Sequence, residues 1–100
     1  MIKHVVMWKF KDFAAGNLKE ENIEIAVEKL LLLKDLVDEI KFLEVGKNIN
    51  ESDAAYELVL ITEFENLSDL EQYQIHPEHE KVKDFIEKTA AKRVLVDYEK

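Results

Sequence analysis

The stretch IKHVVMWKF, residues 2–10, alternates between two sets of side chains in the way that a β-strand requires. The first set is almost wholly apolar and consists of Ile2, His4, Val6, Trp8 and Phe10. The second set is polar at its ends and apolar at Val5 and Met7. Tyr56–Phe64 is likewise apolar on both faces, and we expect it to form a central strand that is buried on both sides at its centre.

Beyond this strand the apolar period changes to that of a helix. Asn17 and Glu20 have the spacing of a capping box, and a long apolar stripe follows them. The stripe consists of Ile23, Val27, Leu30, Leu33, Val37 and Ile40, while Ile25, Leu31, Leu32 and Leu36 lie off it. The first helix therefore carries more apolar surface than one contact with a sheet would cover.

Three further strands and a second helical region complete the predicted order βαββαβ. The strands are expected at Phe42–Ile49, Tyr56–Phe64 and Val94–Tyr98, with a short helical turn at Leu67–Tyr73 and a helix that opens at Pro77. This order predicts a single α+β domain over residues 1–100. Its architecture is ferredoxin-like, a four-stranded antiparallel sheet with the helices on one face.

The face of this sheet that points away from the helices has no cover within one chain. We expect Val5, Met7, Val59 and Ile61 on that face, with Leu95 as a further candidate. Burial against a second copy of the chain would remove this apolar surface from water. We therefore predict a homodimer that forms through the open face of the sheet.

Composition excludes several classes of function. A hydrophobic content of 47% supports a compact core, and the absence of cysteine excludes disulfides, thiolate catalysis and iron–sulfur sites. A net charge of -8 opposes binding to nucleic acid, and no apolar stretch predicts insertion into a membrane, so we expect a cytoplasmic protein. Two glycines are too few for a nucleotide-binding loop, and no cofactor is expected.

The stretch QYQIHPEHE predicts a possible acid–base site at the start of the last helix. Pro77 suits the first helical position and His76 the N-cap before it. His79 then lies in the first turn, on the apolar side that it shares with Val82. An imidazole in such surroundings, near the positive end of a helix, is expected to be neutral and able to accept a proton.

Several segments together resemble the stress-responsive α/β-barrel family, known as Dabb. The segments are Ile2–Val6 with Trp8–Phe10, Leu43–Asn48, Ala55–Leu60, Tyr73–His79 and Val96–Tyr98, and they extend over nearly the whole chain. The resemblance implies a ferredoxin-like fold and a dimeric α+β barrel. It does not imply one activity, because most members have no assigned reaction.

One plant branch of the family looks like a set of polyketide cyclases. The resemblance implies a catalytic base at His79, an assisting tyrosine at Tyr73 and a pocket histidine at His4. A histidine often found on the third strand of that branch is replaced here by Leu58. The cyclase interpretation is therefore incomplete.

The expected ligand-binding residues are His4, Val6, Trp8, Tyr56 and Leu58, with His79 and Tyr73 as the catalytic candidates. Each has a structural alternative. His79 could stabilise the helix start, His4 could be a hydrogen-bonded core residue, and Tyr73 could pack its ring under the short helix. No metal site is predicted, because the two histidines near Pro77 lack the i,i+4 spacing of the zinc helix motif.

Three functional hypotheses remain open from the sequence. The leading one is a homodimeric barrel that binds a small phenolic or carbonyl compound between sheet and helices. The second is a cofactor-independent cyclase or lyase in which His79 removes a proton and Tyr73 stabilises an enolate. The third is a stress-protective dimer without a ligand, in which Trp8 and Phe85 fill the pocket.

Overall fold

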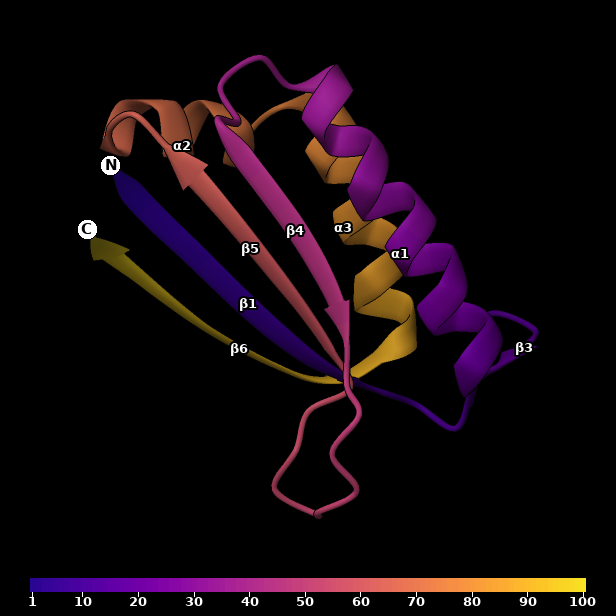
Figure 1. The fold of residues 1–100 in the computed structure, drawn as a ribbon. Coiled ribbons are helices and arrows are strands. Elements are labelled where there is room, and N and C mark those ends of the chain that lie inside the picture. The colour runs from indigo at the N-terminus through magenta and orange to yellow at the C-terminus, as the bar shows by residue number, and fades with distance from the viewer.

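A computed structural model describes residues 1–100 as one four-stranded sheet with helices on one side (Figure 1). The elements in chain order are β1 (Ile2–Phe10), β2 (Phe13–Ala14), β3 (Asn17–Leu18), α1 (Lys19–Leu36), β4 (Phe42–Lys47), β5 (Leu58–Phe64), α2 (Leu67–Gln74), α3 (Pro77–Thr89) and β6 (Ala90–Glu99). The strand order is β4-β5-β1-β6, with every pair antiparallel. The predicted α+β class and ferredoxin-like order are confirmed.

The central position of β1 explains its apolar pattern. It pairs with β5 on one side and β6 on the other, so that Val6 lies opposite both Leu60 and Leu95. Alternate residues of β1 and β5 are buried beneath the helices. Since facing residues of an antiparallel pair lie on the same side of the sheet, this register determines which side chains meet the helices.

The core forms where α1 and α3 lie across one face of the sheet (Figure 1). Leu30 and Leu33 of α1 and Ile86 of α3 are buried there against Val6 and Leu60. The predicted stripe of α1 is buried or partly buried, and Leu31, Leu32 and Leu36 are exposed. None of the helices has both the length and the apolar character needed to cross a membrane.

The start of α1 differs from the prediction. The expected capping box of Asn17 and Glu20 is wrong, because Asn17 belongs to the small β2–β3 hairpin. The chain reverses at Ala15 and Gly16, which both have positive φ angles, and this turn keeps the following residue extended. The helix is capped instead by the Glu21 carboxylate, which accepts a hydrogen bond of 3.1 Å from the backbone N–H of Leu18.

The strand boundaries also differ in detail from those predicted. The second strand ends at Lys47, before Ile49, and the third begins at Leu58, after Tyr56. The last strand is longer than expected and begins at Ala90, directly after α3. The register shifts between Lys9 and Phe10, where one extra residue of β6 is accommodated.

The placement of Leu95 on the open face of the sheet is wrong. It lies opposite Val6 and therefore on the side of the helices. The open face carries Val94, Val96 and Tyr98 of this strand, opposite Met7, Val5 and Lys3. With Phe42, Val59 and Ile61 from the neighbouring strands, these apolar residues form what we call the open-face patch. The expectation for Val5, Met7, Val59 and Ile61 agrees with this register.

The adjacent leucines of α1 provide a test of this packing. We expect Leu33→Ala to lower the free energy of unfolding by about 3 kcal/mol, because it removes a fully buried side chain and leaves a cavity. Leu32, which is 58% exposed, serves as the matched control, and Leu32→Ala should change stability by less than about 0.5 kcal/mol. Urea unfolding of both variants measures the difference, and equal losses would contradict the assigned orientation of α1.

Candidate functional site

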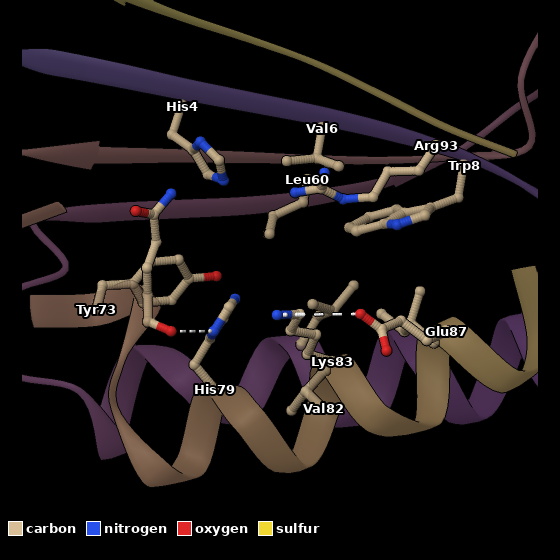
Figure 2. Close-up of a pocket in the computed structure, with 13 residues that line it drawn as sticks. His4, Val6, Trp8, Leu60, Tyr73, His79, Val82, Lys83, Glu87 and Arg93 are labelled. Atoms are coloured by element: carbon tan, nitrogen blue, oxygen red, sulfur yellow. Dashed lines mark hydrogen bonds and ion pairs between the residues drawn. The ribbon is translucent and has the colours of Figure 1, made fainter. Parts of the chain in front are cut away.

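A cavity of about 350 Å³ lies between the helix side of the sheet and α3 (Figure 2). Its volume is within the range of about 300–1,000 Å³ that is usual for small-molecule sites. We call it the sheet–helix cavity, and its walls are His4, Val6, Trp8, Leu30, Leu60, Tyr73, Gln74, His79, Val82, Lys83, Ile86, Glu87 and Arg93. The structure thus brings together five of the predicted site residues: His4, Val6, Trp8, Tyr73 and His79.

The junction of α2 and α3 places His79 at the cavity. His76 caps α3 as predicted, because its Nδ1 accepts a hydrogen bond of 3.1 Å from the backbone N–H of Glu78, and Pro77 occupies the first helical position. His79 then points from α3 into the cavity (Figure 2). Its Nδ1 lies 3.1 Å from the backbone carbonyl of Gln74. Since a carbonyl can only accept, Nδ1 carries the proton in the neutral ring and Nε2 keeps a free lone pair.

Burial controls the protonation of His79. Desolvation of the ring lowers its pKa below the ordinary 6.5, while the hydrogen bond to Gln74 acts in the opposite direction. The charges of Glu80, His4 and Lys83 contribute smaller effects. The ring is therefore neutral near physiological pH, and its Nε2 is able to accept a proton.

Tyr73 lies between the two cavity histidines. Its ring centroid is 4.4 Å from that of His79 and 6.2 Å from that of His4, and Phe64 packs on it at 5.1 Å. The side chain is buried, and its hydroxyl points into the cavity (Figure 2). Burial raises the pKa of the phenol well above its usual value, although the positive charge of Arg93 partly opposes this effect. Tyr73 thus remains a neutral hydrogen-bond donor.

His4 is held in place by Asp97, a residue that the sequence analysis did not select. The two residues face each other across β1 and β6, and the His4 Nδ1–H donates to the Asp97 carboxylate. His4 is only 3% exposed. The carboxylate fixes the orientation of the ring and leaves Nε2 as its second polar atom. Only the period-two spacing of Arg93, Leu95 and Asp97 could have indicated that these residues share the face of His4.

Trp8, Lys83, Glu87 and Arg93 complete the charged and aromatic lining, and sequence reasoning identified only the first of these. Trp8 and Glu87 lie at the end of the cavity away from Tyr73, and the Lys83 side chain lies between His79 and Glu87 (Figure 2). Lys83 and Glu87 are one helical turn apart on α3, and their charged atoms are 4.0 Å apart. Arg93 reaches over the cavity from β6 (Figure 2). The i,i+4 spacing of His79 and Lys83 was the available signal for the α3 residues.

Tyr56 and Leu58 lie away from the sheet–helix cavity, although the sequence analysis placed them in the ligand site. Tyr56 precedes β5, and its ring lies 5.1 Å from the Nζ atom of Lys9. Leu58 is on the helix side of β5, but it is buried in the core opposite Trp8 and Lys47. Both residues instead border a separate shallow hollow near Met7.

No group of three or more His, Cys, Asp or Glu side chains is arranged to hold a metal ion. His76 uses Nδ1 to cap α3, and His4 is oriented by Asp97. The arrangement of His4, Tyr73 and His79 is suited to an organic ligand, since it offers one hydroxyl donor and two imidazole nitrogens at one end of an apolar cavity.

The lowered pKa of His79 predicts a pH dependence of stability. Between the folded-state pKa and 6.5 the unfolded chain binds more protons than the folded chain. The contribution of the neutral His79 ring to stability is thus fully present above pH 6.5, and it is lost as the pH falls through the folded-state pKa of this ring. We expect His79→Gln to reduce this part of the acid destabilisation in urea unfolding series at several pH values. Parallel stability curves for the two proteins would contradict the assignment.

Comparisons with known proteins agree with the fold and identify the family. The dimeric protein of unknown function with a ferredoxin-like fold from Bacteroides fragilis is 31% identical, with a TM-score of 0.87, over 99% of this chain and 95% of that chain. An uncharacterized protein of Streptomyces coelicolor is 26% identical over 80 residues, which are 80% of each chain. The hydroxynitrile lyase from Passiflora edulis shares the fold at 19% identity, with a TM-score of 0.79 over 97% of this chain and 90% of that chain. Residues 2–100 match the stress responsive A/B barrel domain, and the chain therefore belongs to the Dabb family.

Proposed function

We propose that this Dabb protein is a homodimer that binds a small phenolic or carbonyl compound in the sheet–helix cavity. The observation that carries the proposal is the grouping of His4, Tyr73 and His79 at one end of a cavity of about 350 Å³. A hydroxyl donor beside a neutral imidazole matches a ligand that has both an acceptor oxygen and a donor or an acidic C–H group. The walls between the polar ends are apolar, as is usual for a site of this kind.

An enzymatic role is the second candidate, and it is supported by the state of His79. A neutral imidazole with a free Nε2 is able to remove a proton next to a carbonyl, and the Tyr73 hydroxyl is able to stabilise the enolate that forms. A cyclase or a lyase would use such a step. The likeness to hydroxynitrile lyase is one of fold, so this candidate depends on the chemistry of the two side chains.

A ligand-free protective dimer is the third candidate. According to this hypothesis, the side chains of Trp8 and Phe85 fill the pocket. Here Trp8 forms a wall of the cavity and Phe85 is only partly buried, with the Lys29 ammonium 5.5 Å from its ring. This arrangement favours the ligand-binding candidate.

The open-face patch supports the homodimer. Met7, Phe42, Val94, Val96 and Tyr98 each expose about two fifths or more of their surface in the single chain. A contiguous apolar surface on a sheet is stabilised by burial against another protein surface. Two copies packed through this face would produce the dimeric barrel typical of the family, and the Bacteroides fragilis relative is dimeric.

We expect saturable NMR shifts of the His79 and His4 imidazole signals when a panel of phenolic acids and β-keto compounds is added. His76, which is outside the cavity, is the internal control. Tyr73→Phe should weaken binding about two- to tenfold, because it removes one hydroxyl hydrogen bond and keeps the ring. His79→Ala should abolish the shifts at His4 or strongly reduce them.

The same panel distinguishes the enzymatic candidate. Product formation by the wild type that falls at least about 100-fold in His79→Ala, with an unchanged circular dichroism spectrum, would support a general base. Binding without turnover would exclude the enzymatic candidate for these compounds and support the ligand-binding candidate. The absence of any shift or turnover in an intact dimer would refute both and favour the protective dimer.

The dimer interface is tested by two neighbouring residues on opposite faces of β6. Val96 is 53% exposed on the open face, whereas Leu95 is 49% exposed on the helix side. We expect Val96→Lys to raise the dimer dissociation constant by at least about tenfold, because an unpaired charge would be buried in an apolar interface. Leu95→Lys is the matched control. Light scattering across a dilution series measures both, and an undisturbed Val96→Lys dimer would refute the interface.

A further inference from the structure

We propose that the ligand of the sheet–helix cavity is an organic acid whose carboxylate binds Arg93 and the indole N–H of Trp8, with its carbonyl or phenol group at His79 and Tyr73. This inference depends on the proposed ligand-binding function and adds the chemical class of the ligand. It arises from Trp8 and Arg93, two lining residues that the proposed chemistry does not use.

The first observation is an unpaired donor in the cavity wall. Trp8 is 5% exposed, and its Nε1 is the one buried side-chain nitrogen or oxygen that lacks a hydrogen-bond partner. Figure 2 shows the indole on the sheet side of the cavity, with its nitrogen on the edge that faces α3. An indole N–H can only donate, and buried donors are almost always paired. An acceptor oxygen on the ligand would supply the missing partner.

The second observation is a free guanidinium group beside this donor. Arg93 is the only arginine of the chain. The protein has seven ion pairs, and Arg93 takes part in none of them. Its side chain runs over the cavity, and it also borders a neighbouring hollow of about 200 Å³ that shares Trp8, Ile86 and Glu87 with the cavity. The planar fork of an arginine matches the two oxygens of a carboxylate, which a lysine does not do.

The local charge also favours an anion. Glu87 is the only carboxylate among the residues that line the cavity, and Lys83 lies 4.0 Å from it. These two charges compensate each other, so Arg93 provides the uncompensated positive charge of the cavity lining. With neutral histidines the residues that line the cavity thus carry one net positive charge, although the chain as a whole has a net charge of -8.

The two ends together define the shape of the ligand. Apolar side chains of Val6, Leu60 and Val82 lie between Trp8 and the histidine end of the cavity, and the Arg93 side chain extends from Trp8 toward this middle section (Figure 2). A flat or short aliphatic body would occupy this middle section. Its acid group and its carbonyl would then lie at opposite ends of the molecule.

The test compares 4-acetylbenzoate with the neutral, nearly isosteric 4-acetylbenzamide, both of which present an acetyl carbonyl. The chain has a single tryptophan and a single arginine, so the indole Nε1–H and guanidinium Nε–H NMR signals are unambiguous. We expect the acid to bind at least about tenfold more tightly than the amide and to shift both signals together with His79. Arg93→Gln should remove this preference, whereas Lys88→Gln, which removes the same charge outside the cavity, should keep it.

Trp8→Phe provides a second variant, because it keeps an aromatic wall and removes the N–H donor. It should weaken binding of the acid more than binding of the amide. Equal binding of the two probes, unchanged by Arg93→Gln but still visible at His79, would overturn the carboxylate proposal and leave the ligand-binding function intact. The absence of shifts at His79, Trp8 and Arg93 with either probe would overturn both.

Discussion

The pairing of β1 between β5 and β6 is the constraint on which the rest of this structure depends. Side chains alternate along a strand, so a register slip of one residue would exchange the two faces of β1. It would move Val6 and Trp8 out of the core and bring Val5 and Met7 beneath the helices. The present register places the large apolar side chains under α1 and α3, and the same register brings Asp97 opposite His4 and Arg93 opposite Trp8.

One sheet thus supports two different surfaces. On the helix side, α3 covers the strands and encloses a cavity with an imidazole and a phenol at one end, an indole at the other and a guanidinium group over its middle. On the other side, the open-face patch has no cover within the chain. The two proposed roles are therefore separate in space, because the residues proposed to contact a second copy and those proposed to contact a ligand lie on opposite faces of the sheet.

The candidate site is built from short-range and long-range elements in different ways. His76 and Pro77 determine where α3 begins, and this local geometry directs His79 toward the sheet. Its hydrogen bond to Gln74 crosses the break between α2 and α3 and selects the tautomer. Asp97, by contrast, comes from the far end of the chain to orient His4. The position of His79 is therefore set by neighbouring residues in the sequence, whereas that of His4 depends on the pairing of β1 with β6.

Sequence patterns alone were enough to predict the order of the four sheet strands and the main helices, the start of α3, and the faces of β1 and β5. Those properties follow from the periods of apolar residues and from the fixed φ angle of Pro77, which act within a few residues. The folded arrangement was needed to show that Leu95 faces the helices, that Tyr56 and Leu58 lie outside the cavity, that Arg93 lines it and that Asp97 orients His4. The final strand is exposed along nearly its whole length, so its sequence carries no strong apolar period. The register of β6 is set by its pairing with β1, which lies at the other end of the sequence. A local sequence pattern cannot encode a contact between such distant residues.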